Sequence, residues 1–152
     1  MEFKLDQAIG MHVNRTAFLM TEEIARRFND QGYAVTAQDF GILYRVSKQG
    51  PMTQVEIAAL MMRDKTTITR RIDGLVKKGL VARTPDPDDR RYYRIGLTAA
   101  GEAALTVLIP LVSDFQHELL RDIPDADKKT TINTLKHISN QLISYKTKGE
   151  AS

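Results

Sequence analysis

The sequence predicts a mainly α-helical protein with a small β wing, organised as a winged helix-turn-helix lobe between long terminal helices. The first observation is residues 53–97, which contain a short helical segment, a turn, a second helical segment and two strand-like runs around a charged tip. In the second helical segment, residues 64–78, apolar residues recur at i, i+4, i+7 and i+8, as Ile68, Ile72, Leu75 and Val76. Both ends of the chain, residues 8–30 and 98–146, also carry apolar residues at helical spacing.

Two helices are expected before the helix-turn-helix. The first covers residues 8–29 and ends where Gly32 favours a left-handed cap. Its apolar stripe consists of Val13, Ala17, Met20, Ile24 and Phe28. The second begins at Thr36, and Asp39 stands three residues later in the capping-box position. Its inward positions are expected to be Phe40, Leu43, Tyr44 and Ser47.

The helix-turn-helix itself begins at Thr53, which is expected to cap a short helix in a second capping box with Glu56. The apolar residues of this short helix, expected on its buried side, are Val55, Ile57, Ala58, Leu60 and Met61. The turn at residues 62–65 lacks the glycine often found in such turns. The next helix is expected to begin with Asp64 or Thr66 as its cap.

The wing follows Gly79, which is placed to end the preceding helix. One short strand is expected at residues 80–83 and another at 92–97, with Tyr93, Ile95 and Leu97 alternating onto one face. The tip between them contains two prolines, which we expect to lie outside the paired strands.

Two helices are expected after the wing. Thr98 is placed to cap the first, which runs to about Leu120 and contains Pro110, so a kink or a break is expected near that residue. The last helix is expected from Asp125 to about Tyr145, followed by a frayed tail. Its stripe consists of Ile132, Leu135, Ile138 and Leu142.

Positive charge is concentrated in the proposed helix-turn-helix and wing. Residues 63–94 hold ten basic and five acidic side chains, a net charge of +5, whereas the whole chain has a formal net charge of only +3. The rest of the chain is therefore mildly acidic. A local basic surface on such a body suits a polyanionic partner, and double-stranded DNA is the one we expect.

Several other classes of protein are disfavoured by composition. The chain has no cysteine, which excludes disulfides and thiolate metal sites. No apolar run approaches the ~20 residues that a membrane span needs, and the N-terminus does not resemble a signal peptide, so a cytoplasmic protein is expected. We find no nucleophile–base pair, glycine-rich phosphate loop or paired carboxylates, so we expect neither an enzyme nor a cofactor.

The whole pattern resembles the MarR family of winged helix-turn-helix transcriptional regulators. Five segments carry the resemblance, in this order: Thr36–Phe40, Thr53–Ala58, Thr66–Val81, Asp86–Arg91 and Leu97–Gly101. Their combined span covers about residues 8–145. No single segment is specific, and it is their order and spacing that make the match.

The resemblance implies a homodimer in which one helix of each chain lies in the major groove of DNA and a wing arginine enters the minor groove. On that basis we expect residues 36–97 to be the DNA-binding lobe, and residues 8–30 and 98–146 to be the dimerisation region. The unpartnered apolar stripes of the terminal helices independently favour a dimer. A two-fold dimer predicts a pseudo-palindromic operator.

The candidate DNA contacts lie in the helix-turn-helix and at the wing tip. They are Thr53, Gln54, Lys65, Thr66, Thr67, Thr69, Arg70, Arg71, Asp89, Arg90 and Arg91. Arg70 is expected on the outward face, where a guanidinium can pair with guanine, and Arg71 toward the flank, with a phosphate or Asp89 as its partner. The resemblance implies that Asp89 orients an arginine and that Arg91 reaches the groove, with Arg90 as the alternative.

Other polar residues have plainer interpretations. The threonines could be caps, and the arginines of the second helix a solvated face. The aspartates at the tip are expected to stay solvated or to hold arginines rather than to bind a metal. The resemblance also implies a pocket for a small anionic or aromatic effector, for which His12, Arg15 and Tyr44 are the candidates.

The sequence therefore predicts a sequence-specific, DNA-binding transcriptional regulator that acts as a ligand-responsive repressor. The alternative is a winged-helix module that binds another protein without specific DNA binding, because fold alone does not fix function. The local charge of residues 63–94 argues against that alternative.

Overall fold

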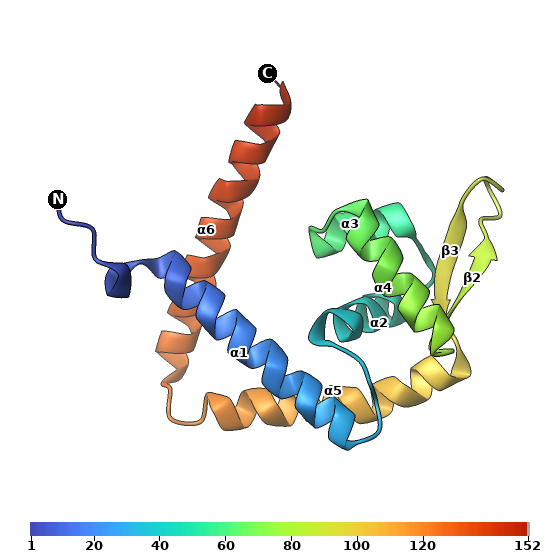
Figure 1. The fold of residues 1–152 in the computed structure, drawn as a ribbon, viewed down its shortest axis with the longest axis horizontal. Helices are drawn as coiled ribbons and strands as arrows, with labels where there is room; N and C mark the ends of the chain where they lie inside the picture. Colours follow the sequence, from blue (N-terminus) through green and yellow to red (C-terminus); the bar gives the residue numbers. More distant parts are fainter. Residues whose placement is uncertain (152) are drawn as a thin grey trace. The chain divides into compact units, whose positions relative to one another are not determined.

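The computed structural model describes residues 1–151, and Figure 1 shows the order of their elements. After a short 3-10 helix at Leu5–Gln7, the elements are α1 (Ile9–Asp30), α2 (Ala37–Gln49), β1 (Met52–Thr53), α3 (Gln54–Met61), α4 (Lys65–Lys77), β2 (Val81–Pro85), β3 (Tyr93–Leu97), α5 (Ala99–Leu119) and α6 (Asp125–Ala151). The chain forms two compact units, one comprising Met1–Phe115 and the other beginning at Gln116. Among the described residues, no helix is both long and apolar enough to cross a membrane. The predicted fold, mainly α-helical with a winged helix-turn-helix, is confirmed.

A three-stranded antiparallel sheet forms the wing, with β3 in the centre between β1 and β2. The sequence predicts only two of these strands, because β1 is two residues long and too short to show an alternating pattern. Met52 pairs with Ile95, and Thr53 with Arg94. The expectation that both prolines lie outside the strands is wrong for Pro85, which ends β2 opposite Tyr93. An edge strand tolerates proline because only one of its sides is paired.

The core of the first unit is shared by the helix-turn-helix, the wing and the flanking helices. Its fully buried members include Phe28 of α1 and Leu108 of α5, so residues 36–97 do not close a core by themselves. In α2 the buried apolar positions are Ile42, Leu43 and Val46. The expected inward positions Tyr44 and Ser47 are instead exposed, because the packing of α1, α3 and the wing around α2 favours a neighbouring face.

Helix α3 is only partly covered. Ile57 is fully buried, and Ala58 and Met61 are half-buried against the core. The expected buried residues Val55 and Leu60 are 54% and 43% exposed. Apolar residues lie on every side of this short helix, so the sequence does not indicate which face is buried. The buried face is set by the contacts of α3 with α4, α2 and the sheet.

Side-chain caps fix where the helices begin. Both predicted capping boxes, Thr36 with Asp39 and Thr53 with Glu56, are present. Asp64 rather than Thr66 caps α4. The Thr98 hydroxyl accepts a hydrogen bond from Gly101 N (3.0 Å) and so caps α5. These caps satisfy N–H groups that have no partner within their helices.

Helix α5 is more continuous than expected, and helix α6 is longer. Helix α5 runs through Pro110 without a break, because a proline removes one hydrogen bond and the turns on either side keep theirs. Helix α6 continues past Tyr145 to Ala151, so the expected frayed tail is wrong up to that residue, and Ser152 lies outside the described residues. Lys148 in its last turn suits the negative end of the helix dipole.

Candidate nucleic-acid interface

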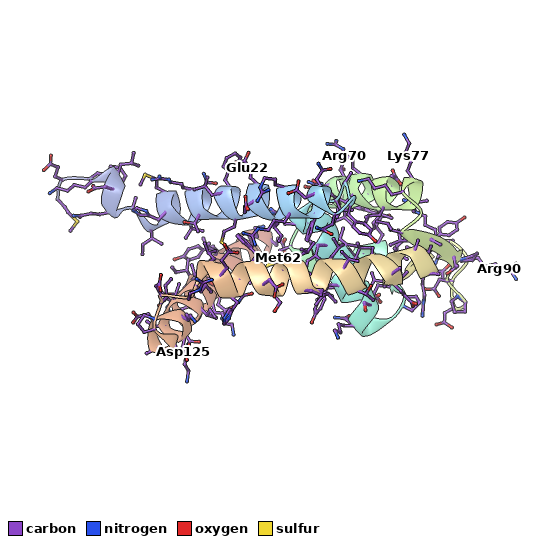
Figure 2. The ribbon with its side chains drawn as sticks, turned by 90° about the horizontal axis from the view of Figure 1, so that it is seen from below. Glu22, Met62, Arg70, Lys77, Arg90 and Asp125 are labelled. Atoms are coloured by element: carbon purple, nitrogen blue, oxygen red, sulfur yellow. The ribbon has the colours of Figure 1, made fainter. Side chains whose placement is uncertain are left out.

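Helix α4 is anchored along one face and exposed along the other. Ile68, Ile72 and Leu75 are buried in the core. Arg70 is exposed on the other side and makes no hydrogen bond or ion pair with any described residue. Figure 2 shows Arg70 and Lys77 projecting from the same side of α4. The helix therefore presents a charged guanidinium with all its donors available to an external acceptor.

The N-terminus of α4 is held by Asp64. Its carboxylate accepts hydrogen bonds from Thr67 N (2.8 Å) and from the Thr67 hydroxyl (2.7 Å). These bonds stabilise the charged carboxylate and lower the pKa of Asp64 below its ordinary value. Thr67, a candidate DNA contact, thus serves as a partner of the cap. Thr66 and Lys65, beside it, are exposed.

Arg71 turns away from the wing and toward α2. Its Nη1 donates to the Thr36 hydroxyl (3.2 Å), its Nη2 donates to Gln38 Oε1, and the Asp39 carboxylate lies 3.8 Å from Nη1. The expected pairing with Asp89 is wrong, because Asp89 is occupied elsewhere. Arg71 joins α4 to the capping box of α2 and so sets the position of the exposed face that carries Arg70.

A second side-chain link joins α3 to α4. Gln54 Nε2 donates to the Thr69 hydroxyl, which itself donates to Lys65 O (2.8 Å). The Thr53 hydroxyl accepts from Glu56 N (3.2 Å). Three candidate contacts, Thr53, Gln54 and Thr69, therefore have partners within the helix-turn-helix, and the bond between Gln54 and Thr69 joins its two helices.

At the wing tip, Arg91 is paired with Asp89. Asp89 Oδ1 accepts from Arg91 N and Nε, both at 3.1 Å, and Oδ2 accepts from Nη2 at 2.8 Å. These bonds lower the pKa of Asp89. The Arg91 side chain is nonetheless 83% exposed. Arg90, at the end of the tip in Figure 2, has no partner among the described residues.

Behind the tip lies a second pair, Asp86 with Arg94, which the sequence analysis did not single out. Asp86 is only 8% exposed, and it accepts from Asp88 N (2.8 Å), Asp89 N (3.3 Å) and Arg94 Nε (3.1 Å). The backbone bond from Asp88, and next the Arg94 side chain, lower the pKa of Asp86. The run Asp-Pro-Asp-Asp indicates an aspartate turn, but nothing local indicates a partner eight residues away.

The base of the wing is tied to α4. Arg83 Nη2 on β2 donates to Asp73 Oδ1 on α4. This ion pair links α4 to β2 at the base of the wing. No group of three or more His, Asp or Glu side chains within the described part of the chain is arranged to hold a metal ion.

The three effector candidates are all exposed. His12 Nε2 lies 2.6 Å from Asp6 O. The Tyr44 ring packs against Phe40, with ring centroids 5.9 Å apart, and lies 5.5 Å from Lys48 Nζ. Arg15 is exposed on the first half of α1. None of these interactions joins two of the three effector candidates.

Comparison with known proteins assigns this architecture to a family. The MarR family model matches residues 35–93, from the start of α2 to the wing. The multiple antibiotic resistance protein MarR of Escherichia coli is 33% identical, over 66% of this chain and 70% of its own length. The chain belongs to the MarR family. The uncharacterised HTH-type transcriptional regulator YwoH of Bacillus subtilis is 31% identical, over 77% of this chain and 83% of its own length.

The fold agrees with solved MarR-type structures. BpsR of Bordetella bronchiseptica, whose DNA binding is regulated by 6-hydroxynicotinic acid, superposes with a TM-score of 0.80 at 22% identity, over 91% of this chain and 98% of its own. MarR-family proteins are transcriptional regulators and not enzymes. This chain is therefore a winged helix-turn-helix transcriptional regulator that binds DNA.

Proposed function

We propose that the protein is a homodimeric repressor that binds a pseudo-palindromic operator and is released by a small ligand. One observation supports this mode of DNA binding: some side chains of α4 are bonded within the protein, whereas others are exposed and free to bind an external group. Arg71, Thr67 and Thr69 are used to hold the helix, whereas Arg70 is exposed without an internal partner among the described residues. The helix therefore enters the major groove with Arg70 as its principal reader of bases.

Arg70 has the chemistry for this task. A guanidinium donates two parallel hydrogen bonds to O6 and N7 of guanine, which is the commonest specific contact in the major groove. Lys65 and Thr66, exposed near the N-terminus of α4, are placed for phosphates or base edges. The capping and bridging roles of Thr53, Gln54, Thr67 and Thr69 make them supports of this surface in the unbound protein.

At the wing, Arg91 is the residue that we propose enters the minor groove. Asp89 holds its guanidinium through two bonds, which reduces the side-chain entropy lost on insertion. Arg90 is exposed with no such support and contacts the phosphate backbone. A narrow, A·T-rich minor groove attracts an inserted arginine through its enhanced negative potential.

Exposed apolar side chains support the homodimer. On α1, Val13 is 45% and Phe18 60% exposed. On α6, Ile132 is 51% and Leu142 56% exposed. Burying these faces against a second copy removes apolar surface from water, at roughly 25 cal/mol per Å². Residues 8–30 and 98–146 then serve as the dimerisation region and residues 36–97 as the DNA-binding lobe, with two α4 helices about 34 Å apart.

For the effector we propose a small anionic or aromatic molecule. The solved structure of BpsR concerns regulation of DNA binding by 6-hydroxynicotinic acid, which is both aromatic and acidic. His12, Arg15 and Tyr44 offer an imidazole, a cation and a ring for such a ligand. A mobility-shift titration with 6-hydroxynicotinic acid tests the ligand class: release of DNA supports it, and unchanged binding at millimolar ligand rejects this compound.

The reading mode is tested by Arg70→Ala, with Arg26→Ala as the control. Both variants remove one positive charge, but Arg26 lies on α1 in ion pairs with Glu23 and Asp30. In mobility shifts on operators selected from random DNA, Arg70→Ala should weaken binding by about 1–3 kcal/mol and relax the choice of one base pair. Arg26→Ala should leave the sequence choice unchanged. If Arg70→Ala binds the operator as wild type does, the assignment of the recognition face is wrong.

Oligomeric state and DNA binding are tested together. Analytical ultracentrifugation should give twice the mass of one 17.1 kDa chain. The selected operator should contain two inverted half-sites about one DNA turn apart. A monomer that ignores duplexes at low salt would instead favour the alternative, a winged-helix module for binding another protein.

A further inference from the structure

Arg94 lies in the middle of the wing sheet. It lies on β3, the central strand, where it pairs with Thr53 of β1 on one side and Thr84 of β2 on the other. Its side chain is 37% exposed. The backbone of Arg94 is therefore fixed from both sides, and its guanidinium extends from the sheet toward the tip.

The guanidinium of Arg94 meets the buried carboxylate of Asp86. Nε donates to Oδ2 at 3.1 Å, and the Asp86 side chain is only 10% exposed. The Asp88 carboxylate lies 3.8 Å from Nη2. Arg94 thus neutralises two carboxylates that would otherwise repel each other, and within the described part of the chain it is the one charged side chain paired with Asp86.

The other oxygen of Asp86 organises the tip. Oδ1 accepts from Asp88 N and Asp89 N, so the carboxylate fixes the backbone at Asp89. The side chain of Asp89 then holds Arg91 through its backbone N–H and its guanidinium. The contacts form one continuous series, from Arg94 to Asp86, from Asp86 to Asp89, and from Asp89 to Arg91.

We propose that Arg94 is a positioning residue for DNA recognition, which acts through Asp86 and Asp89 to hold Arg91 in the geometry that enters the minor groove. The inference rests on the proposed role of Arg91. Loss of Arg94 leaves Asp86 with only its backbone donors, and the tip can then rearrange. Arg91 remains present and charged, but it must be ordered on binding, at an entropic cost.

Two other roles of Arg94 predict different behaviour. If Arg94 only stabilises the fold, its loss lowers the unfolding midpoint without changing which DNA is preferred. If Arg94 contacts a phosphate itself, its contribution is independent of Arg91, and the two losses multiply. A residue that acts through Arg91 has nothing further to contribute once Arg91 is removed.

A double-mutant cycle separates these roles. Binding to the selected operator is measured for wild type, Arg91→Ala, Arg94→Gln and the double variant. We expect Arg91→Ala to weaken binding about tenfold, Arg94→Gln to weaken it severalfold, and the double variant to match Arg91→Ala within about twofold. Arg94→Gln should also lose the preference for A·T over G·C flanks to the same extent as Arg91→Ala. Multiplicative losses, or Arg94→Gln with wild-type affinity and flank preference, would overturn the proposal.

Arg83→Gln is the matched control. It also removes a guanidinium from a wing strand, but Arg83 pairs with Asp73 of α4 and not with the tip. Its effect on binding should multiply with that of Arg91→Ala. If Arg94→Gln does not fold, Asp86→Asn interrupts the same series at its next member, and the same cycle with Arg91→Ala applies.

Amide hydrogen exchange tests the series without DNA. In the protein alone, Arg94→Gln should accelerate exchange at Asp88 N and Asp89 N, whose acceptor is Asp86, while Arg83→Gln should not. Unchanged exchange at these two amides would overturn the proposal even if binding is weakened. A wild-type protein that binds no duplex would refute the proposed function, and the exchange measurement would still decide whether Arg94 orders the tip.

Discussion

Among the glycines of the described residues, Gly101, in the first turn of α5, is the one where an added Cβ would meet a backbone atom most closely. A Cβ added to Gly101 would lie 2.0 Å from Leu80 O and 3.3 Å from Leu97 Cδ2. The first distance is far inside van der Waals contact, and Leu80 O is a backbone atom that already accepts a hydrogen bond from Thr98 N (3.1 Å). Gly101→Ala therefore forces α5 away from Leu80, the residue that precedes β2.

The magnitude follows from three contributions. Overpacking at a site that cannot relax costs about 1–3 kcal/mol. Displacing α5 also strains the cap in which the Thr98 hydroxyl accepts from Gly101 N, at about 1 kcal/mol. Alanine has a higher helix propensity than glycine, which stabilises the folded protein by about 1 kcal/mol. The net expectation is a loss of about 1–3 kcal/mol in the free energy of unfolding.

Gly74→Ala is the control with the opposite sign. Gly74 lies inside α4, and nothing stands within 4 Å of an added Cβ. Only the gain in helix propensity applies there, so this variant should be about 1 kcal/mol more stable than wild type. Urea unfolding at one fixed protein concentration measures both variants, because dimerisation would make stability depend on concentration. Two variants that shift in the same direction would refute the reasoning.

Other substitutions test single interactions. Asp64→Ala removes the cap of α4 and should lower the unfolding free energy by about 1 kcal/mol in urea titrations, whereas Asp64→Asn should retain most of it. Arg71→Ala should lower the thermal midpoint by loosening α4 from α2, while Arg70→Ala should leave it unchanged; equal midpoints would contradict the anchoring role of Arg71. Hydrogen bonds from Arg26 and Arg27 lower the pKa of Glu23 from 4.5 to about 2, so this carboxylate stabilises the fold above pH 4.5 and that contribution is lost as the pH falls toward 2. Unfolding measured across that range should be less pH-dependent for Glu23→Gln than for wild type.

The features that could be predicted from the sequence depend on residues close together along the chain. A capping box joins two residues three positions apart, which is why Thr36 with Asp39 and Thr53 with Glu56 could be identified in advance. The apolar stripe of α4 repeats within two turns, and its residues Ile68, Ile72 and Leu75 are buried as predicted. The pairing of Asp89 with an arginine, which the resemblance to the MarR family implies, is also present, with Arg91 as the partner.

The features that were missed depend on elements far apart in the sequence. Arg71 reaches Thr36, which lies 35 residues earlier, because the fold brings this side of α4 beside the start of α2. The exposed side of α3 is defined by what covers its other side. Strand β1 exists only because β3 lies beside it. No local pattern of residues carries this information.

The sequence by itself determined the order of the helices, the two capping boxes, the local basic charge and the resemblance to the family, because each of these is written in the spacing and identity of neighbouring residues. Only the tertiary structure decided which arginines are available and which are used internally. Arg70, Arg71, Arg91 and Arg94 are chemically identical in the sequence, and they differ in what the fold places within hydrogen-bonding distance of each guanidinium.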